Sequence, residues 1–244
     1  AAKAPGSGGR QLTLLGSYTW SKSIDTASGI RGQGDAQSPN DSRCLSCERG
    51  VSGFNKPHRA VTSLVYELPF GKGRQFGAAW NPILNHIAGG WQVSSILTFE
   101  SGNPANASSP GGRNSLAYVL GDRLNCTGEN WRLPSGQRTT GLWFNRGAFA
   151  LPGQGVVGNC GRNILIGPGR QLLDGSIQKS FRILEGHSID FRLEGFNVWN
   201  HRVLGTPGTG WGSTNPAVPS ATFGQITGTA ASMRQLQFGL KYVF

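Results

Sequence analysis

Four cysteines are the residues of this sequence with the most distinctive chemistry: Cys44, Cys47, Cys126 and Cys160. An even number of cysteines fits disulfides formed in an oxidising compartment, with three pairings possible. Cys44 and Cys47 could instead form a redox-active CxxC or half of a zinc site. A redox-active CxxC opens a helix in a βαβ unit, and zinc needs a second close pair of ligands. Neither context surrounds this pair, so we favour disulfides and expect no metal and no cofactor.

Two further motifs resemble catalytic or nucleotide-binding signatures. Ser176 and Lys179 have the SxxK spacing, but on a strand they point to opposite faces and cannot act as nucleophile and base. Gly71, Gly73 and Gly77 have the spacing GxGxxxG, whereas a dinucleotide fingerprint needs GxGxxG opening a helix. We expect a turn with no helix after these glycines. The four histidines form no HxH or HExxH ligand set. These patterns predict a protein that is not an enzyme.

Six charged residues fall at the polar positions of alternating segments: Glu67, Glu100, Asp174, Asp190, Arg192 and Glu194. A hydrated lumen with cross-strand ion pairs accounts for such a set. A paired acid and base remains an alternative, but no spacing singles out two carboxylates.

Composition limits the classes of protein to consider. The chain has 244 residues, of which 37% are hydrophobic and 14% charged, and it contains 38 glycines and 13 prolines. This composition is typical of a β-rich chain with long loops. The net charge of +11 could indicate nucleic-acid binding, but the basic residues are scattered and not interleaved with aromatic residues. We therefore expect no nucleic-acid partner. No apolar stretch of about 18 residues is present to form a transmembrane helix.

Period-two alternation of apolar and polar residues predicts six strands of about ten residues each. They lie near 12–21, 60–68, 91–100, 173–181, 189–194 and 235–244. A soluble sandwich would show the same alternation. However, strands of about ten residues are long for a soluble sheet and match the 9–11 residues that a tilted strand needs to cross a bilayer.

Connection lengths favour the membrane alternative. The long loops 22–57, 102–171 and 200–233 alternate with the shorter connections 69–90 and 183–187. Consecutive antiparallel strands place all three long loops on one side, as in outer-membrane barrels. Further short strands could lie at 116–120 and 222–227. We therefore predict one all-β segment over 1–244, an antiparallel up-and-down transmembrane-type β-barrel or part of one, with six to eight long strands.

Several stretches, taken in order, resemble one family. They are "GSYTWSKSID" (16–25), "PHRAVTSLVYELPFGKGR" (57–74), "GGWQVSSILTFESGNP" (89–104), "WFNRGAFALP" (143–152), "FRLEGFNVWNHRVLG" (191–205), "FGQITGTA" (223–230) and "RQLQFGLKYVF" (234–244). Together they resemble the C-terminal part of TonB-dependent outer-membrane receptors of the Oar-like type, which carries a carboxypeptidase-regulatory-like domain. The resemblance implies a Gram-negative outer membrane, lipid contact, and ligand binding or uptake at the cell surface.

The closing strand resembles the C-terminal signal that barrel-assembly machinery reads. Its positions are Leu236, Phe238, Leu240, Tyr242 and Phe244. The family implies a barrel of about 22 strands with a plug and a TonB-contacting segment, and six to eight strands are too few for it. The expected partners are therefore the remainder of a receptor barrel or further copies of this chain. The alternative function is a self-assembling fibre or tube built from receptor-derived strands, without transport.

Overall fold

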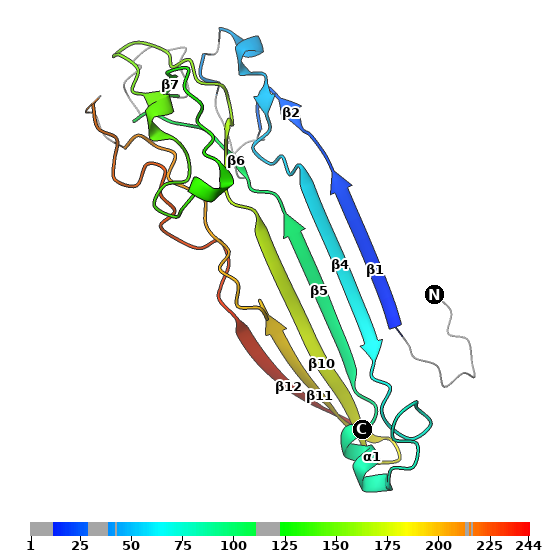
Figure 1. The fold of residues 1–244 in the computed structure, drawn as a ribbon. Helices are drawn as coiled ribbons and strands as arrows, with labels where there is room; N and C mark the ends of the chain where they lie inside the picture. Colours follow the sequence, from blue (N-terminus) through cyan, green and yellow to red (C-terminus); the bar gives the residue numbers. More distant parts are fainter. Residues whose placement is uncertain (1–11, 29–38, 42, 111–122, 213–214, 216) are drawn as a thin grey trace.

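A computed structural model gives the fold and describes residues 12–28, 39–41, 43–110, 123–212, 215 and 217–244. Its centre is a six-stranded antiparallel sheet in the order β1-β4-β5-β10-β11-β12 (Figure 1). The strands are β1 (Leu12–Trp20), β4 (His58–Glu67), β5 (Gln92–Glu100), β10 (Arg170–Leu184), β11 (His187–Phe196) and β12 (Gln235–Val243). All six strands follow one another up and down, which confirms the predicted all-β fold.

The register of the sheet explains why the sequence alternates. Leu64 lies opposite Leu14 on β1, and Thr62 lies opposite Leu97 on β5. Farther along, Leu193 lies between Ile177 on β10 and Phe238 on β12. Because successive side chains of a strand point to opposite faces, this register collects the apolar positions on one face and the polar positions on the other.

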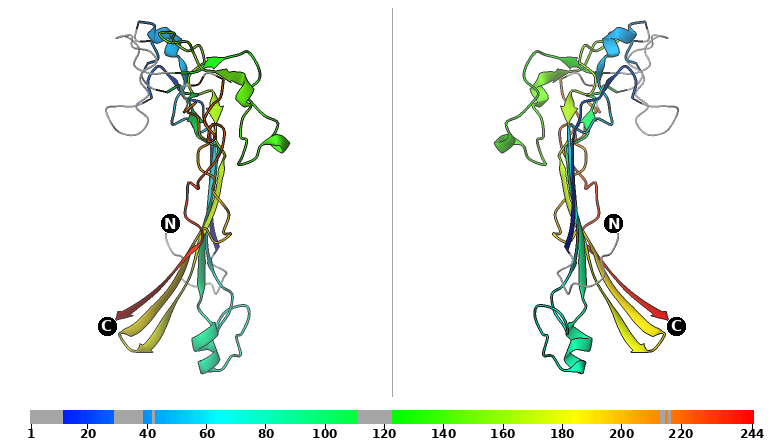
Figure 2. Two further views of the ribbon diagram at one scale, coloured as in Figure 1. Left: turned by 90° about the vertical axis from the view of Figure 1, so that its left-hand side faces the viewer. Right: turned by 90° about the vertical axis from the view of Figure 1, so that its right-hand side faces the viewer.

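The sheet is not closed. Within the described residues, β1 pairs only with β4 and β12 pairs only with β11. Since neighbouring strands alternate in direction, these two edge strands run antiparallel to each other. The sheet is twisted, and the ends of β10, β11 and β12 near the C-terminus turn away from the helix at the same end (Figure 2).

The three long connections all lie at one end of the sheet, as predicted (Figure 1). We call the described residues of 21–57, 101–169 and 197–234 the loop cap. The loop cap contains the short strands β2 (Ile24–Asp25), β3 (Gly50–Val51), β6 (Pro104–Ala105), β7 (Asn125–Cys126), β8 (Phe149–Ala150) and β9 (Leu165–Ile166), and the 3-10 turns η1 (Leu45–Glu48), η2 (Ser135–Gln137) and η3 (Arg146–Ala148). At the opposite end, Glu185 and Gly186 join β10 to β11, and Gly186 has the positive φ of 80° that this tight turn requires.

Three sequence expectations need comment. The stretch 222–227 is not a strand; it forms a turn in which Phe223 makes one isolated bridge to Gly208. The other suggested strand, 116–120, lies outside the described residues. The expectation of no helix after Gly77 was wrong, because α1 (Pro82–Ala88) follows it. None of the described helices is long and apolar enough to cross a membrane.

The buried core lies in the loop cap rather than beside the sheet. Phe223 has ring contacts with Phe144, Phe149 and Trp211, at centroid distances of 5.1, 5.8 and 5.5 Å. These four aromatic side chains are almost fully buried. In contrast, every residue of β1 and β12 is exposed. The connections therefore supply their own core, and the sheet leaves its apolar face free.

Candidate functional site

All six charged residues singled out in the sequence lie on the polar face of the sheet. In the register of the sheet, Glu67 lies opposite Gln92, Gln92 opposite Gln178, and Gln178 opposite Arg192, so this row of polar residues crosses four strands. On the neighbouring strand β12, Lys241 lies opposite Asp190, and Gln237 lies opposite Glu194. Asp174 occupies the same face, and its Oδ1 accepts a hydrogen bond from the backbone N–H of Asn197 at 2.9 Å. Whether this face lines a lumen stays a prediction.

The Glu100 side chain is 6% exposed and has three cationic neighbours. Its oxygens lie 3.5 Å from Lys56 Nζ, 3.2 Å from Arg59 Nε and 3.0 Å from Arg170 Nη2. Arg59 and Arg170 are its register partners on β4 and β10. This cluster joins three strands next to the loop cap and has net positive charge.

Farther from the loop cap, the sheet borders an open hollow of about 620 Å³, lined by residues of the polar face and also by Lys179, Phe191 and Leu240. Its polar lining includes Gln92, Gln178, Asp190, Arg192 and Lys241. Gln178 donates to Gln92 at 2.9 Å, which holds two of these amides in place. The hollow offers hydrogen-bond donors, acceptors and charges of both signs, which suit water or a polar solute.

The register also tests the SxxK motif. The hydroxyl of Ser176 lies 2.8 Å from that of Ser94 on the polar face. Lys179 lies on the apolar face, where its Nζ donates to Ile87 O at 3.1 Å and to Gly89 O. The two residues therefore cannot act together, as predicted.

The apolar face carries the residues of the closing strand. Leu236, Phe238, Leu240 and Tyr242 lie opposite Gly195, Leu193, Phe191 and Ile189 on β11. Tyr242 stacks on Phe244 at 5.8 Å, and the Phe244 side chain is 89% exposed. Whether barrel-assembly machinery reads this strand stays a prediction.

Aromatic side chains gather at both ends of the apolar face. Tyr18 and Trp20 lie near the loop cap, and the Tyr18 hydroxyl lies 2.7 Å from His58 Nδ1. Trp91 packs against Phe181 and Phe191 at the opposite end, with centroids 6.2 and 5.9 Å away. Two such belts around an apolar band are typical of membrane interfaces.

All four cysteines form disulfides within the loop cap, namely Cys44–Cys47 and Cys126–Cys160. Cys44–Cys47 closes the turn at η1, and Cys126–Cys160 joins β7 to a segment 34 residues later. Among the described residues, no group of three or more His, Cys, Asp or Glu side chains is arranged to hold a metal ion.

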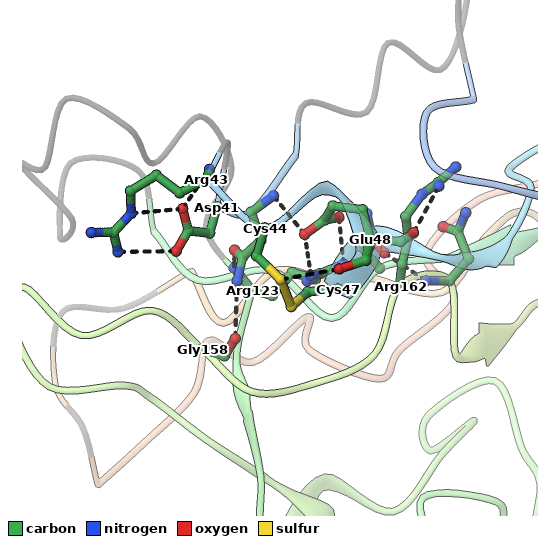
Figure 3. Close-up of polar contacts among 12 residues, drawn as sticks. Asp41, Arg43, Cys44, Cys47, Glu48, Arg123, Gly158 and Arg162 are labelled. Carbon is green, nitrogen blue, oxygen red and sulfur yellow. Dashed lines mark hydrogen bonds and ion pairs between the residues drawn. A yellow bond between two sulfur atoms is a disulfide. The ribbon is translucent and has the colours of Figure 1, made fainter.

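Buried ion pairs hold the first long connection of the loop cap, 21–57, against the second, 101–169 (Figure 3). Glu48 accepts two hydrogen bonds from Arg123, at 2.7 Å (Nη2) and 3.1 Å (Nη1), and one from the Asn40 N–H at 3.0 Å. Arg162 donates to the Glu48 carbonyl at 3.2 Å and pairs with the Asp25 carboxylate. Two carboxylates thus balance two guanidinium groups.

The surroundings shift the pKa values of this cluster. Burial lowers the pKa of the Arg123 guanidinium from its ordinary value, and the Glu48 carboxylate opposes that shift. Partial burial acts to raise the pKa of Asp25, but hydrogen bonds from Ser52, Arg162 and Ser28 outweigh it and leave the pKa below its ordinary value. The lowered pKa keeps the Asp25 carboxylate ionised near neutral pH, and its ion pair with Arg162 holds the two connections together.

The third connection joins the loop cap through its backbone and its aromatic side chains. Trp211 N donates to Ser108 O at 2.8 Å, and Trp143 N donates to Gly224 O at 2.8 Å.

In the second connection, Trp131 and Trp143 border a recess of about 150 Å³. Cavities that hold small ligands measure about 300–1,000 Å³, so these aromatic residues mainly pack the loops together.

Comparison with known proteins gave one match. The model of a family described as outer membrane beta barrel domain matches residues 3–237. Searches of curated proteins and of solved structures found no match.

Proposed function

Because the chain belongs to the family of outer membrane beta barrel domains, we propose that it is a barrel segment of a TonB-dependent receptor type that binds and takes up a ligand at the cell surface. The family itself establishes a location in the outer membrane of Gram-negative bacteria, with lipid as a partner. The observation that carries the proposal is a two-faced sheet of membrane-spanning strands with a locked loop cap at one end.

The two faces support different parts of this proposal. Nine or ten residues, the length of five of the six strands, are enough for a tilted strand to cross a bilayer. The apolar face then contacts lipid. The polar face, with its ion pairs and open hollow, suits a hydrated lumen through which a polar ligand passes.

The loop cap supports a role in ligand contact. In outer-membrane barrels the long loops are extracellular, and the short turns lie in the periplasm. Buried ion pairs, two disulfides and an aromatic core hold this cap in one shape. A preformed surface loses little entropy when it binds a ligand. We also propose that the protein is not an enzyme, since no nucleophile and base are brought together in the described site.

Uptake by energised cells tests this function. Cells with and without the gene are incubated with pools of radiolabelled oligopeptides and oligosaccharides, in the presence and absence of a protonophore. We expect at least one pool to accumulate only when both the gene and the proton gradient are present. Gene-dependent accumulation that a protonophore leaves unchanged would contradict TonB coupling. No gene-dependent accumulation of any pool would contradict uptake of these ligand classes.

The open edges support the second candidate, a self-assembling fibre or tube. Because β1 and β12 run antiparallel, β12 of one copy could continue the antiparallel ladder on β1 of another. Negative-stain images and native mass spectrometry of the purified chain separate the two candidates. Filaments or defined rings would favour self-assembly, whereas a single chain held within a larger barrel would favour the receptor.

A further inference from the structure

The connection between β4 and β5 carries an exposed apolar surface at the end of the sheet opposite the loop cap. Three of its side chains lie on α1: Ile83, Leu84 and Ile87. Ile83 is 74% exposed, and Ile87 is 59% exposed. Positions i and i+4 of a helix lie on the same face, so these side chains form one stripe. Phe76, in the turn before the helix, is also exposed.

The orientation of α1 is fixed at its beginning and its middle. Asn81 is the N-cap, and its Oδ1 accepts a hydrogen bond from Leu84 N at 2.7 Å. Asn85 Oδ1 accepts one from Lys72 N at 2.6 Å, which holds the helix against the preceding turn. The turn and the end of the helix are also packed closely, because a side chain at Gly71 would come within 3.1 Å of the Gly89 backbone. The exposed stripe is therefore a defined surface.

The end of α1 is attached to the apolar face of the sheet. Lys179 donates to the carbonyls of Ile87 and Gly89, and Trp91 Nε1 donates to Ile87 O at 3.0 Å. His86 has an edge contact with Phe181 at 5.7 Å. Trp91, Lys179 and Phe181 all belong to the apolar face, so the stripe continues the lipid-contacting surface beyond the strands.

The charge of this connection is of one sign. Residues 68–90 contain Lys72 and Arg74 but no Asp or Glu. Lys72 is exposed, and Arg74 pairs with Glu67 at 2.7 Å. A basic segment with an apolar helical stripe fits the boundary between headgroups and acyl chains in a membrane that contains anionic lipid.

We propose that residues 76–88 form an interfacial anchor that lies in the periplasmic leaflet of the outer membrane. The occupant of the exposed stripe is phospholipid: Ile83, Leu84 and Ile87 enter the acyl boundary, and Lys72 contacts anionic headgroups. Lys179 is a positioning residue, because it holds α1 at the level of the aromatic belt formed by Trp91 and Phe181. This role adds a lateral contact to the spanning sheet and does not depend on which ligand the protein carries.

Spin labels on the full chain reconstituted in phosphatidylethanolamine–phosphatidylglycerol vesicles test the anchor. One variant carries Ile83→Cys. The matched control carries Glu185→Cys, an exposed position in the β10–β11 turn at the same end of the sheet. All cysteines of the native chain are in disulfides, so labelling without reductant is specific to the introduced thiol. A heat-modifiable band on a gel shows that each labelled variant is folded.

The accessibility of each label to oxygen and to a water-soluble nickel complex is then measured. We expect the label at 83 to collide with oxygen several-fold more, and with the nickel complex several-fold less, than the label at 185. Equal accessibility of both labels to the nickel complex would overturn the anchor and would leave the stripe available to a periplasmic protein. With Lys72→Gln, we expect the difference to decrease in anionic vesicles and to stay unchanged in neutral ones.

Discussion

Arg123 and Glu48 lie 75 residues apart in the sequence and form a bidentate ion pair in which both side chains are buried. Through this pair the first long connection is fixed to the second. The same carboxylate accepts the Asn40 N–H, and Asn40 in turn donates to Gly158 O at 2.9 Å. The shape of the loop cap therefore depends on a few charged groups as well as on its aromatic core.

Replacing Glu48 with Ala is expected to loosen the loop cap without unfolding the sheet. The change leaves the buried Arg123 without its counter-ion, which costs about 3–5 kcal/mol in comparable cases. Amide hydrogen exchange should speed up at residues 40–55 and 123–126 and stay slow in β4 and β5. Asp41→Ala is the control, since it removes an exposed pair with Arg43. Equal effects of the two variants would contradict a special role for the buried pair.

The two disulfides are expected to differ in both reducibility and importance. Cys160 is 2% exposed, whereas Cys47 lies at the surface, so a mild reductant should open Cys44–Cys47 first. Cys126–Cys160 closes the longer loop, and its loss should destabilise the cap by about 2–4 kcal/mol. Mass spectrometry of thiols trapped over time gives the order, and protease resistance of the Cys126→Ser/Cys160→Ser and Cys44→Ser/Cys47→Ser variants compares the effects.

Acid should weaken the contact between Asp25 and Arg162. The pKa of Asp25 in the folded protein lies below its ordinary value of 3.8. A carboxyl group with a lowered pKa contributes stability that is fully present above the unfolded value and is lost as the pH falls through the folded value. We therefore expect the cap to open below about pH 3.8, as followed by tryptophan emission. In Asp25→Asn this part of the acid transition should be absent, and an unchanged transition would contradict the assignment.

A charge on the apolar face should impair membrane folding, whereas the same charge one residue away should not. Arg in the middle of a lipid-facing strand costs about 2–4 kcal/mol, so Phe238→Arg should lower the fraction of heat-modifiable protein after refolding into vesicles. Gln237→Arg adds the same side chain on the polar face, opposite Glu194, and should refold like the native chain. Similar losses in both variants would argue against a lipid contact specific to the Phe238 face.

The strands could be predicted from the sequence because their signal is local. Alternation repeats every two residues, so Leu236 to Tyr242 reveal β12 without knowledge of its neighbour. The resemblance to a receptor family predicted the outer-membrane location, and the lengths of the connections predicted that the three long loops lie on one side. α1 was missed because seven residues between glycine-rich turns give too short a helical period, although Asn81-Pro82 is a recognisable helix start.

The loop cap could not be predicted because its contacts are not local. Asp25 and Arg162 lie 137 residues apart, and no spacing in a glycine-rich loop identifies them as partners. Lys179 presents a related difficulty. Its place in the alternating pattern puts a cation on the apolar face, and only the folded chain shows that it donates hydrogen bonds to two carbonyls at the end of α1.

The contact between Lys179 and α1 has a consequence for the order in which the chain enters the membrane. An ammonium group on a lipid-facing strand is costly to insert unless its hydrogen-bond acceptors accompany it. Those acceptors belong to the β4–β5 hairpin, whereas Lys179 belongs to β10. We therefore expect the hairpin and its helix to be in place when β10 pairs with β5, so that one lysine couples the insertion of strands that the sequence separates by the whole second connection.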